Sequence, residues 1–195
     1  MQSAMSGFIR PVQPATLGCD DDFNLARAAQ IDPQAFAELY RRHLDRVYRY
    51  LLIQSGHKQD AEDLTGQTFL EALQHIGRFR GEGEFAAWLL SIARHRWLDR
   101  LRQIKRDPLP LDEALDLPDG LPTLDVQIGE KLQMRAVLQS LRALAPERAE
   151  AITLRIFSDL TMADVAGVMG KSEAAVKMLV SRGLADLRKR LTDSG

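Results

Sequence analysis

Apolar residues recur at intervals of three and four along most of this chain, the spacing that places them on one face of an α-helix. The longest such stretch follows Asp32 and Pro33 and continues until Gly56. Because Asp favours the N-cap and Pro the first helical turn, we expect a helix to begin at Pro33. The same spacing predicts further helices from Asp22 and over about 58–76 and 85–104.

The second half of the chain shows this spacing in shorter segments, which predict helices over about 124–144, 146–157, 161–169 and 172–191. Between the halves, residues 107–123 contain four prolines, which interrupt helices. We therefore expect an all-α fold with two small helical domains. The expected parts are a flexible N-terminal arm at 1–21, a first domain at 22–106, an acidic flexible linker at 107–123 and a second domain at 124–195. In the 58–76 helix, Leu73 is expected to be buried.

The composition of the chain excludes several kinds of fold and indicates the cellular compartment. The chain has 195 residues, of which 45% are hydrophobic and 6% aromatic. A chain of this size can bury roughly 70% of its extended surface. Cys19 is the single cysteine in the sequence, which excludes a disulfide framework. No apolar run approaches the roughly 20 residues of a membrane span, and residues 1–19 lack the features of a signal peptide. We therefore expect a cytoplasmic protein without membrane insertion.

The net charge of −1 conceals an uneven distribution. Residues 107–130 contain seven acids and no Lys or Arg, so the 26 bases of the chain are accompanied by 20 acids elsewhere. Bases outnumber acids eight to three over 78–106 and six to two over 171–190. Because nucleic-acid binding depends on local charge, both segments are candidate nucleic-acid surfaces.

The segment from Thr161 onward has the pattern of a helix-turn-helix. Thr161 followed by Asp164 favours a helix start, Gly170 supplies a turn, and Ser172 favours the start of a second helix. In a DNA-binding unit of this kind the second helix enters the major groove. Three polar residues share its outward face: Lys177, Ser181 and Arg182. The alternative is an ordinary helical hairpin with a solvated basic face.

Several motifs together resemble a known family. The blocks Asp32-Pro-Gln-Ala-Phe36, Asp60-Ala-Glu-Asp63-Leu64-Thr65 and Phe79-Arg80-Gly81-Glu82 through Trp88-Leu89 are similar to region 2 of the extracytoplasmic-function sigma factors of the sigma-70 family. Leu144-Ala-Pro146-Glu147 and the helix-turn-helix are similar to region 4. The resemblance spans about residues 22–191. It implies a transcription initiation factor that binds bacterial core RNA polymerase and directs it to promoter DNA.

In that family a region 2 helix docks on the clamp of the largest polymerase subunit, and region 4 meets the flap of the second. The resemblance therefore implies polymerase-binding roles for Asp60, Glu62, Asp63, Gln67 and Thr68. Clustered acceptors on one helix can meet Arg-rich partners. The alternative is that the acids only stabilise the helix N-terminus. Family members are also commonly inhibited by an anti-sigma factor, and we expect one here.

The resemblance further implies that the minus-ten element is recognised as single-stranded DNA, with an unstacked base held in a pocket. The implied loop and helix residues are Phe79, Arg80, Gly81, Glu82, Gly83 and His95, with Arg94, Arg96, Arg100 and Arg102 binding phosphates. Many relatives have Asn at the position of His95, so base preference is expected to differ. Trp88 is expected in the core, whereas Trp97 can either pack there or stack on a base.

For the minus-thirty-five element, the resemblance implies contacts from Arg155, Lys171, Ser172, Lys177, Ser181 and Arg182. Relatives often have Ser-Arg where this chain has Met178 and Leu179, which alters the expected sequence preference. The acidic linker is expected to imitate a phosphate chain in a polymerase channel. Alternatively, it is a solvated tether.

Other functional classes find less support. The four histidines lack metal-ligand spacing, and the chain has no Walker loop, nucleophile elbow or dinucleotide fingerprint. We therefore expect no catalytic residue, metal site or cofactor. A conventional helix-turn-helix regulator would explain residues 161–191 but not the first-domain motifs. An adaptor without a DNA role would leave the basic segments unexplained.

Overall fold

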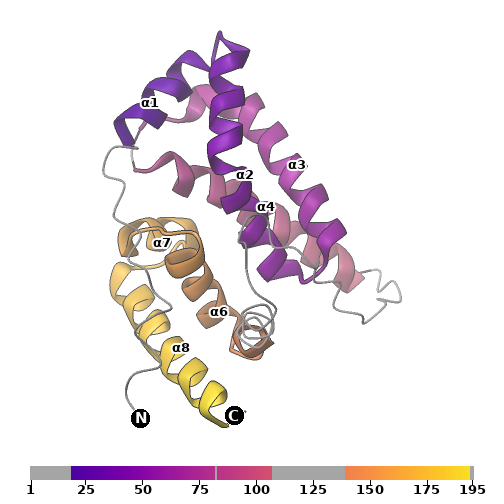
Figure 1. Ribbon diagram of the computed structural model, residues 1–195, viewed down its shortest axis with the longest axis vertical. Coiled ribbons are helices and arrows are strands. Elements are labelled where there is room, and N and C mark those ends of the chain that lie inside the picture. The colour runs from indigo at the N-terminus through magenta and orange to yellow at the C-terminus, as the bar shows by residue number, and fades with distance from the viewer. Residues whose placement is uncertain (1–18, 82, 107–138, 194–195) are drawn as a thin grey trace, which may run out of the picture.

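The computed structural model describes residues 19–81, 83–106 and 139–193, and all regular elements in these ranges are helices (Figure 1). The N-terminal bundle consists of α1 (Cys19–Ala28), α2 (Pro33–Ser55), α3 (Lys58–His75), the 3-10 turn η1 (Ile76–Arg78) and α4 (Phe85–Arg106). The C-terminal unit consists of α6 (Pro146–Ile152), the π-helical segment η2 (Thr153–Phe157), α7 (Met162–Met169) and α8 (Glu173–Asp193). The predicted all-α class is confirmed. The predicted linker, 107–123, lies outside the described residues.

Both ends of α2 follow the local signals in the sequence. The Asp32 carboxylate accepts a hydrogen bond from the backbone N–H of Gln34 at 2.9 Å, and Pro33 is the first helical residue. At the other end Gly56 adopts a left-handed conformation with φ of 75°, and its N–H donates to the carbonyl of Leu52. The predicted start at Pro33 and the stop at Gly56 are both confirmed.

Helix α1 begins at Cys19, three residues before the predicted start at Asp22. Tertiary ion pairs are formed at this end, because two of its three acids, Asp21 and Asp22, are bound by α2. Arg42 pairs with Asp21 at 2.7 Å, and His43 Nε2 lies 2.7 Å from an oxygen of Asp22. Hydrophobic spacing carries no information about such contacts, so it placed the start too late.

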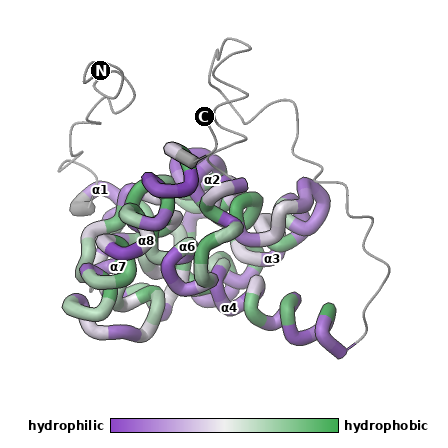
Figure 2. Tube along the Cα trace, turned by 90° about the horizontal axis from the view of Figure 1, so that it is seen from below, coloured by the Kyte–Doolittle hydropathy of each residue, from purple (hydrophilic) through white to green (hydrophobic). Residues whose placement is uncertain are grey.

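Helices α2, α3 and α4 pack around an apolar centre that includes Leu39, Val47, Leu51, Leu89 and Leu90, all fully buried. Hydrophobic and hydrophilic stretches alternate along these helices, as expected of amphipathic segments with one face in a core (Figure 2). Their packing holds the polar faces of α3 and α4 side by side. The two candidate faces of the first domain are therefore positioned by one core.

In the C-terminal unit, α6 lies along α8. Helix α7 packs against α8 at one end of this pair (Figure 1). The predicted continuous helix over 146–157 is wrong in detail, since it changes at Thr153 into a π-helical segment. The Ser158 N–H donates to the Thr153 carbonyl at 3.0 Å, which closes a five-residue turn. Leu154, within this segment, and Leu160, just after it, are both fully buried.

The two halves share an apolar core instead of standing apart. One continuous cluster of buried side chains runs from the N-terminal bundle into Leu154, Val165 and Val176 of the C-terminal unit. Ile53 of α2 also joins a second cluster with Leu141 and other residues of the C-terminal unit. In Figure 1, α7 and α6 lie directly below α2 and α4.

No described helix is both long enough and apolar enough to cross a membrane. Among the described residues, no three His, Cys, Asp or Glu side chains come together as a set that could hold a metal ion.

Asp22 provides a test of how α1 is anchored. Burial alone would raise the pKa of Asp22, but hydrogen bonds from His43 and Arg42 outweigh it and lower the pKa below the ordinary value of 3.8. We expect Asp22→Asn to lower the free energy of unfolding by about 1–2 kcal/mol at pH 7. Because the folded-state pKa is depressed, this difference is complete above pH 3.8 and shrinks as the pH falls through the lowered value.

The measurement is urea denaturation of both proteins from pH 7 downward, with Asp45→Asn as the control at an exposed position of α2. A gap between wild type and Asp22→Asn that stays constant with pH would contradict the anchoring role.

Candidate functional site

The exposed side of α3 carries most of the predicted polymerase-binding residues. Glu62, Asp63 and Gln67 are exposed, and Asp60 is partly buried. The Asp60 carboxylate accepts hydrogen bonds from Nη2 and Nε of Arg100 at 3.0 and 3.2 Å. Asp60 is therefore engaged within the bundle, whereas the other three side chains are available to a partner.

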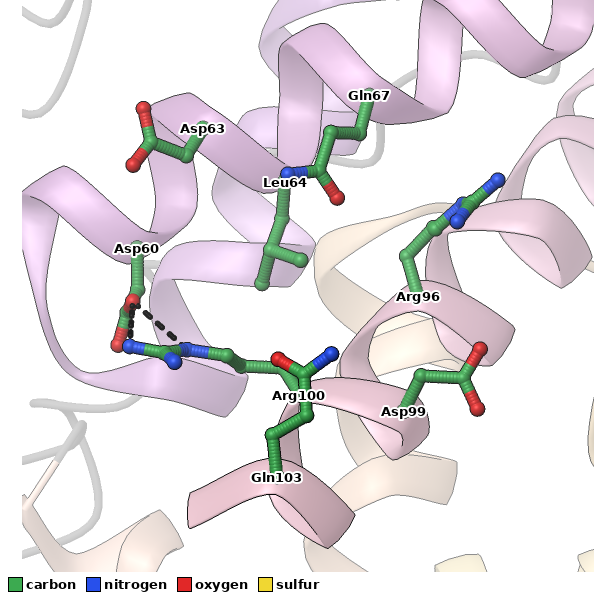
Figure 3. Close-up of a pocket in the computed structure, with 8 residues that line it drawn as sticks. All are labelled: Asp60, Asp63, Leu64, Gln67, Arg96, Asp99, Arg100 and Gln103. Atoms are coloured by element: carbon green, nitrogen blue, oxygen red, sulfur yellow. Dashed lines mark hydrogen bonds and ion pairs between the residues drawn. The ribbon is translucent and has the colours of Figure 1, made fainter. Parts of the chain in front are cut away.

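A polar hollow of about 300 Å³ lies between α3 and α4 beside these residues (Figure 3). Its lining consists of Asp60, Asp63, Leu64, Gln67, Arg96, Asp99, Arg100 and Gln103. In Figure 3, Asp60 and Arg100 close one end of the hollow, while Asp63 points away from that pair. The hollow joins acceptors on α3 to donors on α4, so a partner docking there meets both signs of charge.

Sequence reasoning missed an apolar part of this face. Leu70 is 58% exposed and Leu73 is 45% exposed. Leu73 was expected in the core, but Ala72 and Phe69 take the core-facing positions of this turn and leave Leu73 outside. Exposed leucines next to carboxylates make the face amphipathic. The sequence did contain a signal for this exposure: Phe69 and Ala72 already supply the core-facing residues of this turn, so Leu73 is an additional apolar residue there.

Two predicted contact residues lie inside the protein, which corrects their place in the candidate surfaces. Thr68 is fully buried and donates its hydroxyl to the carbonyl of Leu64 at 2.7 Å. The ring of Phe79 is buried between Phe23, Phe85 and Trp88, with centroid distances of 6.3, 5.2 and 5.6 Å. Neither side chain offers a surface to a partner in this conformation.

The loop between η1 and α4 is shaped by its glycines. Gly81 and Gly83 have φ values of 76° and 94°, in the left-handed region that disfavours other residues. A Cβ atom on Gly81 would lie 2.5 Å from the ring of Phe23, so this position has no room for a side chain. Arg80 next to the loop is exposed, as is His95 on α4. Glu82 lies outside the described residues.

The two tryptophans of α4 differ in environment. Trp88 packs against Phe79 and Phe85, partly buried at the edge of the aromatic cluster. Trp97, for which the sequence left packing and stacking open, is 9% exposed and belongs to the core. The structure therefore offers no exposed Trp ring on α4 as a stacking platform.

Each of the four arginines predicted to bind phosphates has a carboxylate partner. Arg96 pairs with Glu71 at 2.6 Å, Arg100 pairs with Asp60, and Arg102 pairs with Asp99 on its own helix. Arg94 instead reaches the C-terminal unit. The basic face of α4 is thus paired with acids, so a phosphate that binds there competes with a carboxylate for each of these arginines.

Arg94 takes part in a buried polar cluster that joins the halves. Its Nε and Nη2 donate to the two oxygens of Glu150 on α6, at 2.9 and 3.4 Å. The hydroxyl of Tyr50 on α2 donates to the same carboxylate at 3.0 Å. Burial, reinforced by the negative charge of Glu150, raises the pKa of Tyr50, so the phenol stays protonated and remains a donor.

The helix-turn-helix has the predicted caps. Thr161 accepts a hydrogen bond from the Asp164 N–H at 3.1 Å, and the Ser172 hydroxyl accepts one from the Ala175 N–H at 3.2 Å. Gly170 between them is left-handed, with φ of 64°. These contacts end α7 and begin α8, so the helix, turn and capped second helix predicted from the sequence are present.

On α8, Lys177, Ser181 and Arg182 are exposed on the side away from the buried Val176 and Val180. Lys177 pairs with Glu173 one turn earlier, at 2.7 Å. Exposed pairs of this kind contribute little stability and exchange readily. The predicted recognition face is therefore accessible.

Two other residues of this unit that were predicted to contact DNA interact with neighbouring groups of the protein. Arg155 donates to the carbonyl of Leu160 at 3.1 Å, and Lys171 pairs with Glu147 at 2.8 Å. Met178, one of the two departures from the family pattern, is 51% exposed on the recognition helix. The structure thus adds an apolar contact position to that face.

Comparisons with known proteins match both halves. Residues 39–107 match the family described as Sigma-70 region 2, and residues 134–187 match the family described as Sigma-70, region 4. The chain is 38% identical over 169 residues to the ECF RNA polymerase sigma factor BldN of Streptomyces coelicolor, covering 86% of this chain and 64% of BldN. It is 30% identical to the ECF RNA polymerase sigma factor SigM of Mycobacterium tuberculosis, covering 82% of this chain and 79% of SigM.

A solved structure has a similar fold. The sigma factor RpoE of Bartonella quintana, in complex with the anti-sigma factor NepR, superposes with a TM-score of 0.67 at 23% identity. The match covers 80% of this chain and 96% of that one. At this level of identity the likeness concerns the fold.

The burial of Phe79 can be tested directly. We expect Phe79→Ala to lower the free energy of unfolding by about 3–4 kcal/mol, because it leaves a cavity in the aromatic cluster. Phe79→Leu, which keeps most of the volume, is expected to cost about 1 kcal/mol. Urea denaturation of both variants, with Arg80→Ala as the exposed neighbour, gives the comparison. Equal stability of Phe79→Ala and Arg80→Ala would show that the ring does not support the core.

Proposed function

This chain belongs to the extracytoplasmic-function (ECF) RNA polymerase sigma factors, and on that premise we propose that it binds bacterial core RNA polymerase and directs it to specific promoters. One observation carries the proposal. Both sigma regions occur in order in a single chain, each with an exposed face suited to its partner: acidic and apolar on α3, basic on α8. The relatives are sigma factors, which are transcription initiation factors and not enzymes.

The polymerase-binding face of the proposal is the outer side of α3. Glu62, Asp63 and Gln67 supply acceptors, and Leu70 and Leu73 supply apolar area. Interfaces of this composition combine an apolar centre with charges that select the partner. The partner surface is the clamp of the largest subunit, while the C-terminal unit meets the flap of the second.

Promoter binding divides between the halves. In the N-terminal bundle, the loop with Gly81 and Gly83 and the exposed Arg80 and His95 form the surface for the unstacked minus-ten base. In the C-terminal unit, Lys177, Ser181 and Arg182 face the major groove of the minus-thirty-five element. Arg and Lys donate to guanine edges, and Ser can donate or accept, so this set suits base recognition.

We also propose regulation by an anti-sigma factor in the cytoplasm, without cofactor or metal. The fold likeness to RpoE, which was solved in complex with the anti-sigma factor NepR, supports this part of the proposal. The exposed Leu70 and Leu73 offer apolar area that such a partner could cover.

The polymerase-binding proposal is tested with purified core enzyme. We expect the wild-type protein to co-elute with core RNA polymerase in size-exclusion chromatography. Asp63→Lys is expected to weaken binding about tenfold, because it places a cation where the clamp presents cations. Asp45→Lys makes the same charge change at another exposed position, on α2, and should bind like the wild type. Failure of the folded wild-type protein to bind would favour a plain DNA-binding regulator.

The minus-thirty-five surface is tested by transcription. We expect Lys177→Ala with Arg182→Ala to reduce run-off transcription at least about tenfold, since each base contact contributes about 1–3 kcal/mol. The template is a promoter recovered by selection with the wild-type holoenzyme. Arg188→Ala with Lys189→Ala removes the same charge from the distal end of α8 and is expected to have a smaller effect. Equal loss in both double variants would mean that α8 contributes only general electrostatics.

A further inference from the structure

Helix α8 presents Met178 at the centre of its exposed face. Val176 and Val180, two residues to either side of it along the chain, are both buried. Because each helical residue turns the chain by about 100°, both valines point roughly opposite to Met178. Met178 itself is 51% exposed. Its side chain therefore projects away from the protein.

The two residues of α8 that depart from the family pattern have different surroundings. Leu179 is partly buried and packs against the main apolar cluster, so the fold explains its apolar side chain. Met178 belongs to neither of the apolar clusters formed by the described residues. Single exposed apolar residues are common on protein surfaces. This one, however, lies among the residues that are proposed to face the major groove.

The neighbours of Met178 on this face are short or charged. Ala174 lies about one helical turn before it and Ser181 about one turn after it, and both are exposed. The unbranched Met side chain is longer than either, so it extends beyond them toward a surface that α8 contacts. The exposed Lys177 and Arg182 lie on either side of this strip. A duplex attracted by these two cations therefore meets Met178 between them.

The position of Met178 along α8 also suits base recognition. It lies in the second turn of this helix, which begins at Glu173. In helix-turn-helix units, residues near the N-terminus of the recognition helix contact the base edges.

The chemistry of a Met side chain selects among the bases. Thymine is the base that presents a methyl group in the major groove, whereas the other base edges present hydrogen-bond donors and acceptors. Met has no hydrogen-bond donor, and its sulfur is a weak acceptor. Packed against a guanine or adenine edge, Met178 would leave polar groups of the base without partners, which is unfavourable. Against thymine it instead buries two apolar groups together.

We propose that Met178 recognises the C5 methyl group of a thymine in the minus-thirty-five element, between the bases that face Lys177 and Arg182. This inference rests on the proposed function, because it requires that α8 enter the major groove of promoter DNA. It adds a base preference that the serine of many relatives does not give, since a hydroxyl can hydrogen-bond to more than one kind of base. Met178 is therefore a specificity-determining residue of this chain.

The test removes the methyl group from the DNA and the side chain from the protein. Holoenzyme is formed with the full-length chain, and the DNA is the promoter recovered by selection with the wild-type holoenzyme. Each thymine of the minus-thirty-five element is replaced in turn by deoxyuridine, which lacks the C5 methyl group but keeps the same base pairing. At constant salt, we expect one replacement to weaken binding by the wild type about fourfold, through the loss of one buried methyl contact.

Three variants assign this penalty to Met178. Met178→Ala should bind the thymine and deoxyuridine promoters equally, because the contacting side chain is gone. Met178→Leu keeps an apolar side chain of similar volume and should retain most of the discrimination. Leu184→Ala is the matched control and should show the full penalty. Leu184 is also exposed on α8, at 37%, but it points about 120° away from Met178.

Three results would overturn thymine recognition while leaving the proposed function intact. They are a minus-thirty-five element without thymine, wild-type binding that no deoxyuridine replacement weakens, and a penalty that is unchanged in Met178→Ala. The first two need no variant, so they decide the question even if a substitution disturbs the fold. If the folded wild-type chain forms no holoenzyme or recovers no promoter, the proposed function itself fails, and thymine recognition fails with it.

Discussion

The arrangement of the two halves depends on one buried carboxylate. Glu150 lies on the inner face of α6, where an unpaired charge would be strongly unfavourable. Its donors, Tyr50 and Arg94, come from α2 and α4 of the other half. Any docking that moved these groups apart would leave a buried charge without a partner. The apolar clusters could tolerate several neighbouring registers, and the carboxylate reduces them to one.

The arginines of α4 illustrate a related constraint. Arg96 and Arg100 are paired with acids of α3, which favours defined orientations of their side chains before any ligand arrives, whereas Arg102 pairs with Asp99 of its own helix at the exposed surface. Binding a phosphate then exchanges one anion for another. The positive charge that α4 offers to the DNA phosphates is therefore smaller than its number of arginines suggests. Because the salt dependence of binding scales with the phosphate charge that is neutralised, we expect it to be modest for so basic a helix.

Much of the fold could be predicted because its signals are local. Asp32, Gly56, Thr161 and Ser172 mark helix ends through contacts within a few residues, and each was found at its expected place. The resemblance to the sigma family, carried by short motifs in order, is confirmed by the matched regions and relatives.

The parts that could not be predicted depend on contacts distant in sequence. Tyr50 and Glu150 are 100 residues apart, and no spacing rule connects them. The sequence offered one indication: Glu150 lies one helical turn before Leu154, on the face of α6 where apolar residues are expected. Thr68 is polar, so it was assigned to the surface, although its hydroxyl is satisfied by its own helix and its methyl group suits the core. The assigned roles of the exposed residues remain predictions.

The separation of Glu150 from its donors along the chain also determines when the halves can meet during synthesis. The core residues of α2 and α4 are complete once residue 106 has been added, whereas Glu150 follows more than 40 residues later. At about 5–20 residues per second, the ribosome needs a few seconds for that stretch. The N-terminal bundle can therefore fold while Arg94 still lacks its carboxylate. Each new chain can form this contact between its halves only when translation is nearly finished.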